Sequence, residues 1–404
     1  MHKKLWNRDF ILLLQGSAVS MIGDLMYSVA IGYWVYEQTG SSGLMGIMSS
    51  ISMFVTMFLS PFCGSIVDKC NRKWVVVAID AMQGLLMLTV GILAWRNALS
   101  VPIVLLVALL AAFGSVFYSP AISTVMLDII PRDDMVRGQS IHSGIGALIN
   151  MVGTAFSGAM VAFFGVPLIV VLNGISNLYS AVSEFLVRIP RTVHQGEQVT
   201  VKRILDDSRD AVRMIFSDCF LQLFVPCALI LNLLGAGPMS LLLPFCMEKG
   251  FTVDMYGYLG FVYIAGYLLC TVLLGTVKLM PEARFWVMAL GFSCSVPVFV
   301  FAYLSRQFVP MCILAFLASV LNCAGNTVFN ASLMLALPEE NRSAILGFIQ
   351  SASVGGTALS TVAYGLLGDV FPLYLVFALG NAISLIPMLY MCFHPSTKEF
   401  VLAH

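Results

Sequence analysis

Three acidic residues lie inside long apolar stretches of the sequence, namely Asp24, Asp80 and Glu184. A charged side chain is costly in the hydrocarbon of a membrane, so each of the three is a candidate for function. Asp24 lies far from both ends of its stretch, and helical spacing places Ser20 and Tyr27 on the same face. No Lys or Arg occurs in the middle of any such stretch, so a proton or a cationic substrate would have to offset the charge of an isolated, buried Asp24. We interpret Asp24, with Tyr27, as a proton-coupling or substrate residue; a neutral, hydrogen-bonded structural aspartate is the alternative.

The other two acids have basic residues within reach along the same helix. Glu184 precedes Arg188 by four residues, which is the spacing of an ion pair on one helical face. Asp80 lies two turns after Lys73 and shares a face with Gln83. We therefore interpret both acids as structural, with transport chemistry as the alternative for Asp80.

The elements that carry these residues are apolar runs of membrane-spanning length. Of the 404 residues, 59% are hydrophobic and only 10% are charged, whereas soluble domains carry about 25% charged residues. A spanning helix needs about 20 apolar residues. Twelve runs are near or above that length: 10–35, 42–66, 74–95, 101–127, 136–164, 167–187, 220–247, 255–277, 285–304, 308–337, 343–367 and 373–393. The sequence therefore predicts an all-α integral membrane protein with twelve transmembrane helices.

The basic residues determine the expected orientation, because Lys and Arg are retained on the cytoplasmic side of a membrane. With the N-terminus inside, every basic residue except Arg96, Lys249 and Arg306 falls in a cytoplasmic segment. This alternation predicts a multi-pass protein of the cell membrane, plasma or inner, with both termini in the cytoplasm.

The longest polar interval divides the twelve runs into two sets of six. We expect an N-terminal six-helix bundle at 1–187, a cytoplasmic linker at 188–218 and a C-terminal six-helix bundle at 219–404. Within the linker, apolar residues recur at helical spacing and charged residues occupy the other faces, which is typical of an amphipathic helix on a membrane surface. A tether between the bundles is the simplest role for it.

A short charged interval from Gly64 to Lys73, with the sequence GSIVDKCNRK, separates the second and third runs. Its Gly-x-x-x-Asp-Lys-x-x-Arg-Lys pattern resembles the loop between helices 2 and 3 of the major facilitator superfamily of secondary transporters. The segments at 20–24, 37–41 and 117–121 extend the resemblance to the macrolide-efflux type of drug exporter, a branch that also includes siderophore exporters. The resemblance implies two pseudo-symmetric bundles of six helices that alternate access to a central substrate site.

The same resemblance implies a gating role for this interval on the cytoplasmic side. Asp68 would face the start of helix 11, where the helix dipole favours an anion. Arg72 would pair with Asp128 at the end of helix 4, and Gly64 and Lys73 complete the motif. The alternative is that the basic residues only set the topology.

By resemblance, helices 1, 4, 7 and 10 line the substrate cavity. Asn322, Asn326 and Asn330 are spaced by four and share one helical face, which would be costly toward lipid. We expect these three residues to face the interior, together with Asn232 of helix 7 and Tyr118 of helix 4.

The expected activity is secondary transport. No phosphate-binding loop of the Gly-x-x-x-x-Gly-Lys-Ser/Thr kind occurs, so the proton gradient rather than ATP would supply the energy. The absence of cations within the runs favours neutral or cationic amphipathic cargo over anionic cargo. We expect proton-coupled efflux of drugs or antibiotics by alternating access. A siderophore or metabolite exporter, or an importer, is the alternative on the same fold, and a polytopic receptor or membrane enzyme is the least favoured.

The expected partners are a small-molecule substrate, protons and the lipid bilayer, and the protein is expected to act as a monomer. A net charge of zero gives no case for nucleic-acid binding. The ten cysteines form no CxxC pair, which points to packing rather than to metal or redox chemistry. We therefore expect neither an enzyme nor a cofactor.

Overall fold

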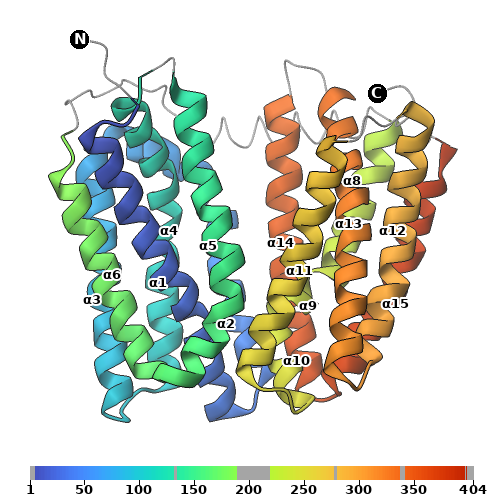
Figure 1. Ribbon diagram of the computed structural model, residues 1–404, viewed down its shortest axis with the longest axis horizontal. Helices are drawn as coiled ribbons and strands as arrows, with labels where there is room; N and C mark the ends of the chain where they lie inside the picture. The colour runs from blue at the N-terminus through green and yellow to red at the C-terminus, as the bar shows by residue number, and fades with distance from the viewer. Residues whose placement is uncertain are drawn as a thin grey trace. The chain divides into compact units, whose positions relative to one another are not determined.

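Helices make up all the regular secondary structure in the part of the chain that the computed structural model describes, which is residues 5–131, 134–188, 219–276, 280–336, 342–395 and 397. Figure 1 shows the long helices running side by side within each half of the chain. They are α1 (Arg8–Thr39), α2 (Ser42–Lys69), α3 (Arg72–Trp95), α4 (Val101–Ile129), α5 (Met135–Phe164), α6 (Val166–Leu186), α8 (Cys219–Gly235), α9 (Gly237–Ser240), α10 (Leu242–Glu248), α11 (Val253–Thr276), α12 (Pro281–Leu304), α13 (Phe308–Ala336), α14 (Arg342–Gly368) and α15 (Leu373–Phe393).

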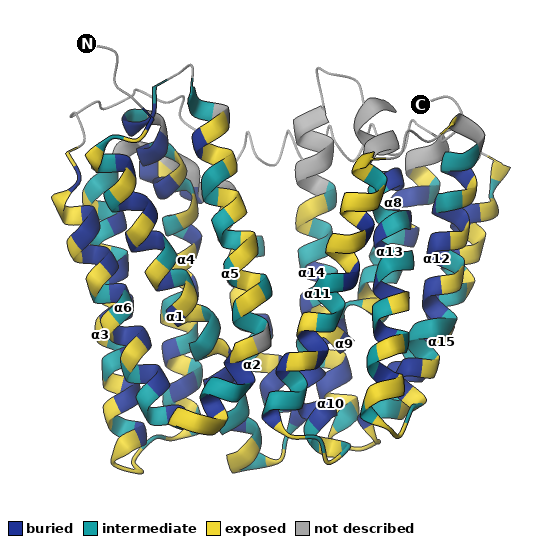
Figure 2. Ribbon diagram, in the orientation of Figure 1, coloured by how far each residue is buried: buried dark blue, intermediate teal, exposed yellow. Residues whose placement is uncertain are grey.

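Each predicted span coincides with a helix or with a set of consecutive helices. Ten described helices are long and apolar enough to cross a membrane, and α5 makes an eleventh when its two bent parts are taken as one span. The remaining predicted span coincides with α14. Large apolar side chains on these helices are exposed, among them Leu85, Trp95 and Phe163, and Figure 2 shows how widely exposed positions are spread over the bundles. An apolar outer surface suits contact with lipid, so the protein is an all-α, multi-pass membrane protein.

The chain divides into two compact units. Unit 1 takes residues 1–40 and 54–201, and unit 2 takes residues 41–53 and 202–404. Helix α2 therefore starts in unit 2 and ends in unit 1. The amphipathic helix predicted in the linker lies within 189–218, outside the described residues.

In unit 1, the helices that carry the three acids pack against one another. Helix α6 lies along both α1 and α3, and α4 lies against α3. Gly23 of α1 permits the close approach to α6, because a Cβ atom at that position would lie only 2.2 Å from Ser176 Oγ. Nearby apolar packing includes Phe10, Leu13 and Met126, each at most 1% exposed. The sequence therefore brings Asp24, Asp80 and Glu184 into one unit through tight helix packing.

In unit 2, α12 packs against α13 and α15, and α11 lies against α13. The seventh predicted span is divided into α8, α9 and α10. The break precedes Pro238, which has no N–H group and lies in the first turn of α9, where that group would have no helical acceptor. The N–H group of Gly237 donates a 2.9 Å hydrogen bond to Ser360 Oγ of α14, so a side chain replaces the missing helical acceptor.

Candidate functional site

The site begins with Asp24 in the middle of α1. Its Oδ1 atom accepts a 3.1 Å hydrogen bond from Asn177 Nδ2 of α6, and Asn177 also donates to Asn173 Oδ1 at 2.9 Å. The Asp24 side chain is exposed and Tyr27 is half-buried. The expectation of an isolated Asp24 was therefore wrong, because α6 approaches closely enough to supply an amide donor.

The sequence interpretation of Glu184 was also wrong. Glu184 is 2% exposed, and its Oε1 atom accepts a 2.8 Å hydrogen bond from the hydroxyl of Tyr118 on α4. Arg188 is exposed and lies beyond the end of α6, where its backbone N–H donates to Asp9 Oδ1 at 3.0 Å. Glu184 therefore points into unit 1 rather than toward the end of its helix. Tyr118, expected in the cavity, directs its hydroxyl to Glu184.

Asp80 of α3 is likewise buried, with a side chain 3% exposed. Its carboxyl group interacts with that of Glu184. It also lies close enough to Asp24 for the two carboxyl groups to interact electrostatically. Lys73, the basic residue expected near it, instead donates a 2.7 Å hydrogen bond from Nζ to the carbonyl of Val187. Asp80 therefore interacts with a second acid, Glu184, and not with the cation that the sequence led us to expect.

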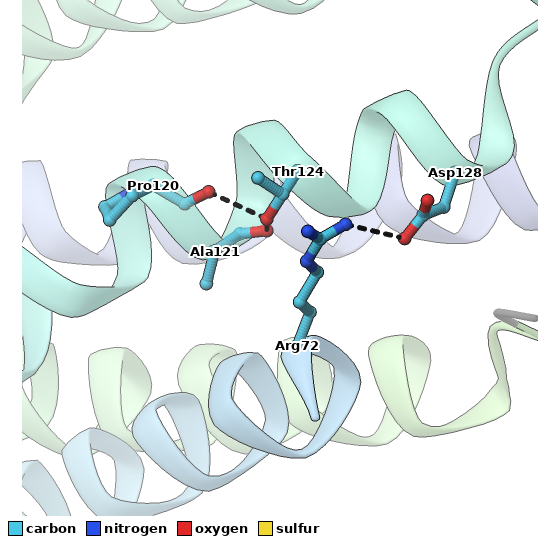
Figure 3. Close-up of polar contacts among 5 residues, drawn as sticks. All are labelled: Arg72, Pro120, Ala121, Thr124 and Asp128. Carbon is cyan, nitrogen blue, oxygen red and sulfur yellow. Dashed lines mark hydrogen bonds and ion pairs between the residues drawn. The ribbon is translucent and has the colours of Figure 1, made fainter. Parts of the chain in front are cut away.

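A second polar feature of unit 1 joins the start of α3 to the end of α4. Arg72 Nη1 lies 3.4 Å from Asp128 Oδ2, and both side chains are nearly buried (Figure 3). Helix α2 continues to Lys69, so only two residues separate it from α3, and Gly64 and Asp68 belong to the last turns of α2 rather than to a loop. The side chain of Asp68 lies outside the described ones.

On α4 beside this pair, the hydroxyl of Thr124 donates to the carbonyls of Pro120 and Ala121 at 3.0 and 2.8 Å (Figure 3). A pocket of about 380 Å³ lies between α2 and this part of α4. It is lined by small or uncharged side chains: Thr56, Ser60, Cys63, Ser115, Val116, Ser119, Pro120 and Ser123. The sequence interpretation missed this pocket, although hydroxyl residues spaced by four at 56 and 60, and at 115, 119 and 123, are visible in the sequence.

In unit 2, the predicted cavity asparagines bond mainly to their own helices. Asn326 Nδ2 donates to the backbone oxygen and Oδ1 of Asn322 at 3.0 and 2.8 Å, and both side chains are half-buried on α13. Asn232 donates to the Ala228 carbonyl at 2.9 Å and approaches Ser353 Oγ of α14 at 3.5 Å. The side chain of Asn330 lies outside the described ones.

Buried acids in a bundle of membrane-spanning helices are rare and mark functional sites, among them the pathways by which integral membrane proteins move ions and polar substrates. The family comparison makes this specific. The model of the Major Facilitator Superfamily matches residues 13–273, and the chain belongs to that superfamily.

Two of the curated relatives of the chain are efflux proteins. Macrolide efflux protein A of Streptococcus pyogenes is 22% identical over 186 residues, which is 46% of this chain and 46% of that protein. Multidrug efflux pump Tap of Mycobacterium tuberculosis is 30% identical over 160 residues, or 38% of each chain. The chain therefore spans less than half the length of the relatives it matches. These relatives are transporters rather than enzymes, the class that the sequence predicted.

Solved structures share the fold over nearly the whole chain. The nucleoside transporter NupG has a TM-score of 0.75 at 13% identity and covers 95% of this chain and 99% of its own. A bacterial homologue of the iron transporter ferroportin in an inward-facing state has a TM-score of 0.70 at 18% identity, covering 97% of this chain and 100% of its own. At these identities the likeness shows the fold alone.

Proposed function

We propose that the protein is a secondary transporter that exports small neutral or cationic amphipathic compounds in exchange for protons. The observation that carries the proposal is the environment of Asp24. Its side chain is exposed, and the hydrogen bond that holds it comes from a neutral amide, that of Asn177. Because no Lys or Arg pairs with it in the described part of the chain, its charge stays available to a proton or to a cationic group of the cargo.

The direction and the class of cargo follow from two further observations. The matched relatives are a macrolide efflux protein and a multidrug efflux pump, which supports export of several compounds. The hydroxyl-lined pocket between α2 and α4 carries no charge, which suits neutral or cationic molecules better than anions.

The remaining predicted residues take their roles from this proposal. Arg72 and Asp128, with Gly64, Asp68 and Lys73, form the cytoplasmic gate. The residues Tyr27, Tyr118, Asn232, Asn322, Asn326 and Asn330 contribute to the substrate path. The protein works as a monomer in the cell membrane with both termini in the cytoplasm.

Proton release on binding of a compound tests the proposal directly. Purified protein in weakly buffered detergent solution is mixed with tetraphenylphosphonium, ethidium or erythromycin while pH and binding are recorded. Wild type should release protons with at least one compound, and Asp24→Asn should bind without release, because the release depends on the carboxylate at position 24. Glu37→Gln, on the exposed end of the same helix, is the matched control and should behave as wild type. Binding with no proton release by wild type would contradict proton exchange at Asp24.

A further inference from the structure

The two buried acids of unit 1 form a pair whose chemistry the proposed function does not yet use. Asp80 on α3 and Glu184 on α6 interact through their carboxyl groups, and Ser180 lies beside both. Both acids are more than nine-tenths buried. The hydroxyl of Tyr118 donates to Glu184 Oε1 at 2.8 Å, which fixes the orientation of that carboxyl group.

The helices packed around this pair supply no cation in the described part of the chain. The titratable groups that act on it are Asp24 from α1 and Tyr118 from α4. Lys73 of α3 is directed to the carbonyl of Val187, and Arg72 to Asp128. On α5, the buried Nε2 atom of His142 has no hydrogen-bond partner, and His142 is not among the groups that act on either carboxyl. Two adjacent carboxylates cannot both be ionised where charge is poorly screened and no cation compensates them.

The hydrogen-bond inventory points to the same conclusion. Among the described residues, no N–H or O–H group donates to Asp80 Oδ2 or to Glu184 Oε2, although both atoms are buried. A buried carboxylate oxygen without a donor is costly, and a proton shared between the two carboxyl groups would provide the missing donor. A metal ion is a poorer occupant, because no group of three or more His, Cys, Asp or Glu residues in the described regions is placed to hold one.

We propose that Asp80 and Glu184 share one proton, oriented by Tyr118, and that this proton leaves when cargo occupies Asp24. The proposal rests on the proposed function, in which Asp24 binds the cargo. An ionised Asp24 lies close enough to Asp80 for its negative charge to favour retention of the shared proton. A cationic cargo that neutralises Asp24 removes this effect, so the O–H bond of the pair breaks and the proton passes to water. The exposed acid thus senses the cargo, and the buried pair stores the proton.

Transport assays in proteoliposomes distinguish the role of the Asp80–Glu184 pair in proton movement from the binding and movement of cargo. Counterflow of tetraphenylphosphonium needs no net proton movement, whereas accumulation driven by a pH gradient does. A gradient of one pH unit supports an accumulation ratio of about tenfold for exchange with one proton. Glu184→Gln and Asp80→Asn should retain counterflow and lose this accumulation. Glu37→Gln should retain both, since Glu37 lies on an exposed part of α1 outside the pair.

The outcomes separate a failure of the shared-proton proposal from a failure of the proposed function. Variants of the pair that keep accumulation driven by pH would overturn the shared proton while leaving Asp24 as the exchange site. Counterflow without accumulation in wild type would overturn proton coupling as a whole.

A measurement that needs neither cargo nor transport covers the case in which the variants fold poorly or tetraphenylphosphonium is not carried. Infrared spectra of wild type should show the carbonyl band of a protonated carboxyl group, and Tyr118→Phe should change the pH at which that band disappears. Each pair variant leaves one buried carboxyl group, so the band should shift in frequency and disappear at a different pH in both variants. Its absence from wild type, or a band unchanged in both variants, would overturn the proposal. Stabilisation of wild type by Ca²⁺ that Glu184→Gln abolishes would assign the oxygens to a hard metal ion instead.

Discussion

The hydroxyl of Ser41 donates a 2.7 Å hydrogen bond to the carboxylate of Asp369, a residue 328 positions later in the chain. The same carboxylate accepts bonds from the Ser42 hydroxyl at 3.1 Å and from the Gly43 N–H group at 3.0 Å. Asp369 directly follows α14, and all four residues belong to unit 2. The carboxylate therefore caps the N-terminus of α2, where free N–H groups and the helix dipole favour a negative charge.

Removal of this cap should lower stability in a way that depends on pH. Asp369→Ala loses all of these bonds, and a lost N-terminal cap costs about 1 kcal/mol, so the unfolding temperature in detergent should fall. Asp369→Asn keeps an acceptor oxygen and should lose less. Glu37→Ala, at the exposed end of α1, should change little. An Asp369→Ala protein as stable as wild type would show that the cap is not needed.

The sign of the pH dependence follows from the bonds to Asp369. Burial alone would raise the pKa of Asp369, but the bonds from Gly43, Ser41 and Ser42 outweigh it, so the pKa lies below its usual value of 3.8. A group with a lowered pKa in the folded state stabilises above its unfolded pKa and loses that contribution as pH falls through the folded value. The stability difference between wild type and Asp369→Asn should therefore be constant above about pH 5 and vanish at more acidic pH. A difference that grew on acidification would contradict this assignment.

The close contact between α2 and α14 predicts opposite effects for two glycine substitutions. A Cβ atom at Gly46 would lie 2.6 Å from the carbonyl oxygen of Thr361, a backbone atom that cannot move aside without the helix. Gly46→Ala should therefore destabilise the protein by about 1–3 kcal/mol through overpacking. At Gly144, in the middle of α5, nothing lies within 4 Å of the added carbon, and Ala should gain up to about 1 kcal/mol from helix propensity. Thermal unfolding of the two variants, side by side, measures both signs.

If Gly46→Ala and Gly144→Ala changed stability equally, helix propensity alone would account for both positions, and the α2–α14 contact would be looser than the structure shows. The comparison is informative because both glycines lie in helix interiors and both variants add one methyl group.

The spans could be predicted because hydrocarbon requires length and apolarity of every crossing segment. The run at 101–127 corresponds to α4, which extends from Val101 to Ile129. Helix ends were less predictable. The second run was expected to stop at Ile66, yet α2 continues through charged residues to Lys69, because long polar side chains can leave the apolar layer while their backbone stays helical.

The partners of the buried acids could not be predicted from spacing. The four-position separation of Glu184 and Arg188 obeys a rule for one helix, whereas the bond from Tyr118 depends on how α4 packs within unit 1. Ser41 and Asp369 illustrate the same limit, since nothing local relates two positions at opposite ends of the chain. Hydropathy determines which segments are helices, and tertiary packing determines which polar side chains meet.

The ion pair of Arg72 and Asp128 is expected to be worth more than a surface pair. Its side chains are only 10% and 12% exposed, so removal of one partner breaks a largely buried ion pair, at a cost of up to about 3–5 kcal/mol. We expect Asp128→Asn and Arg72→Met each to lower the free energy of unfolding by amounts in that range. The double variant should lose about 1–3 kcal/mol less than the sum of the two, because the pair is broken only once. Denaturant unfolding of all four proteins gives this coupling energy, with the exposed Arg96→Met at the other end of α3 as control. Strict additivity would mean that the two charges do not stabilise each other, and the start of α3 would then be held to α4 by apolar packing alone.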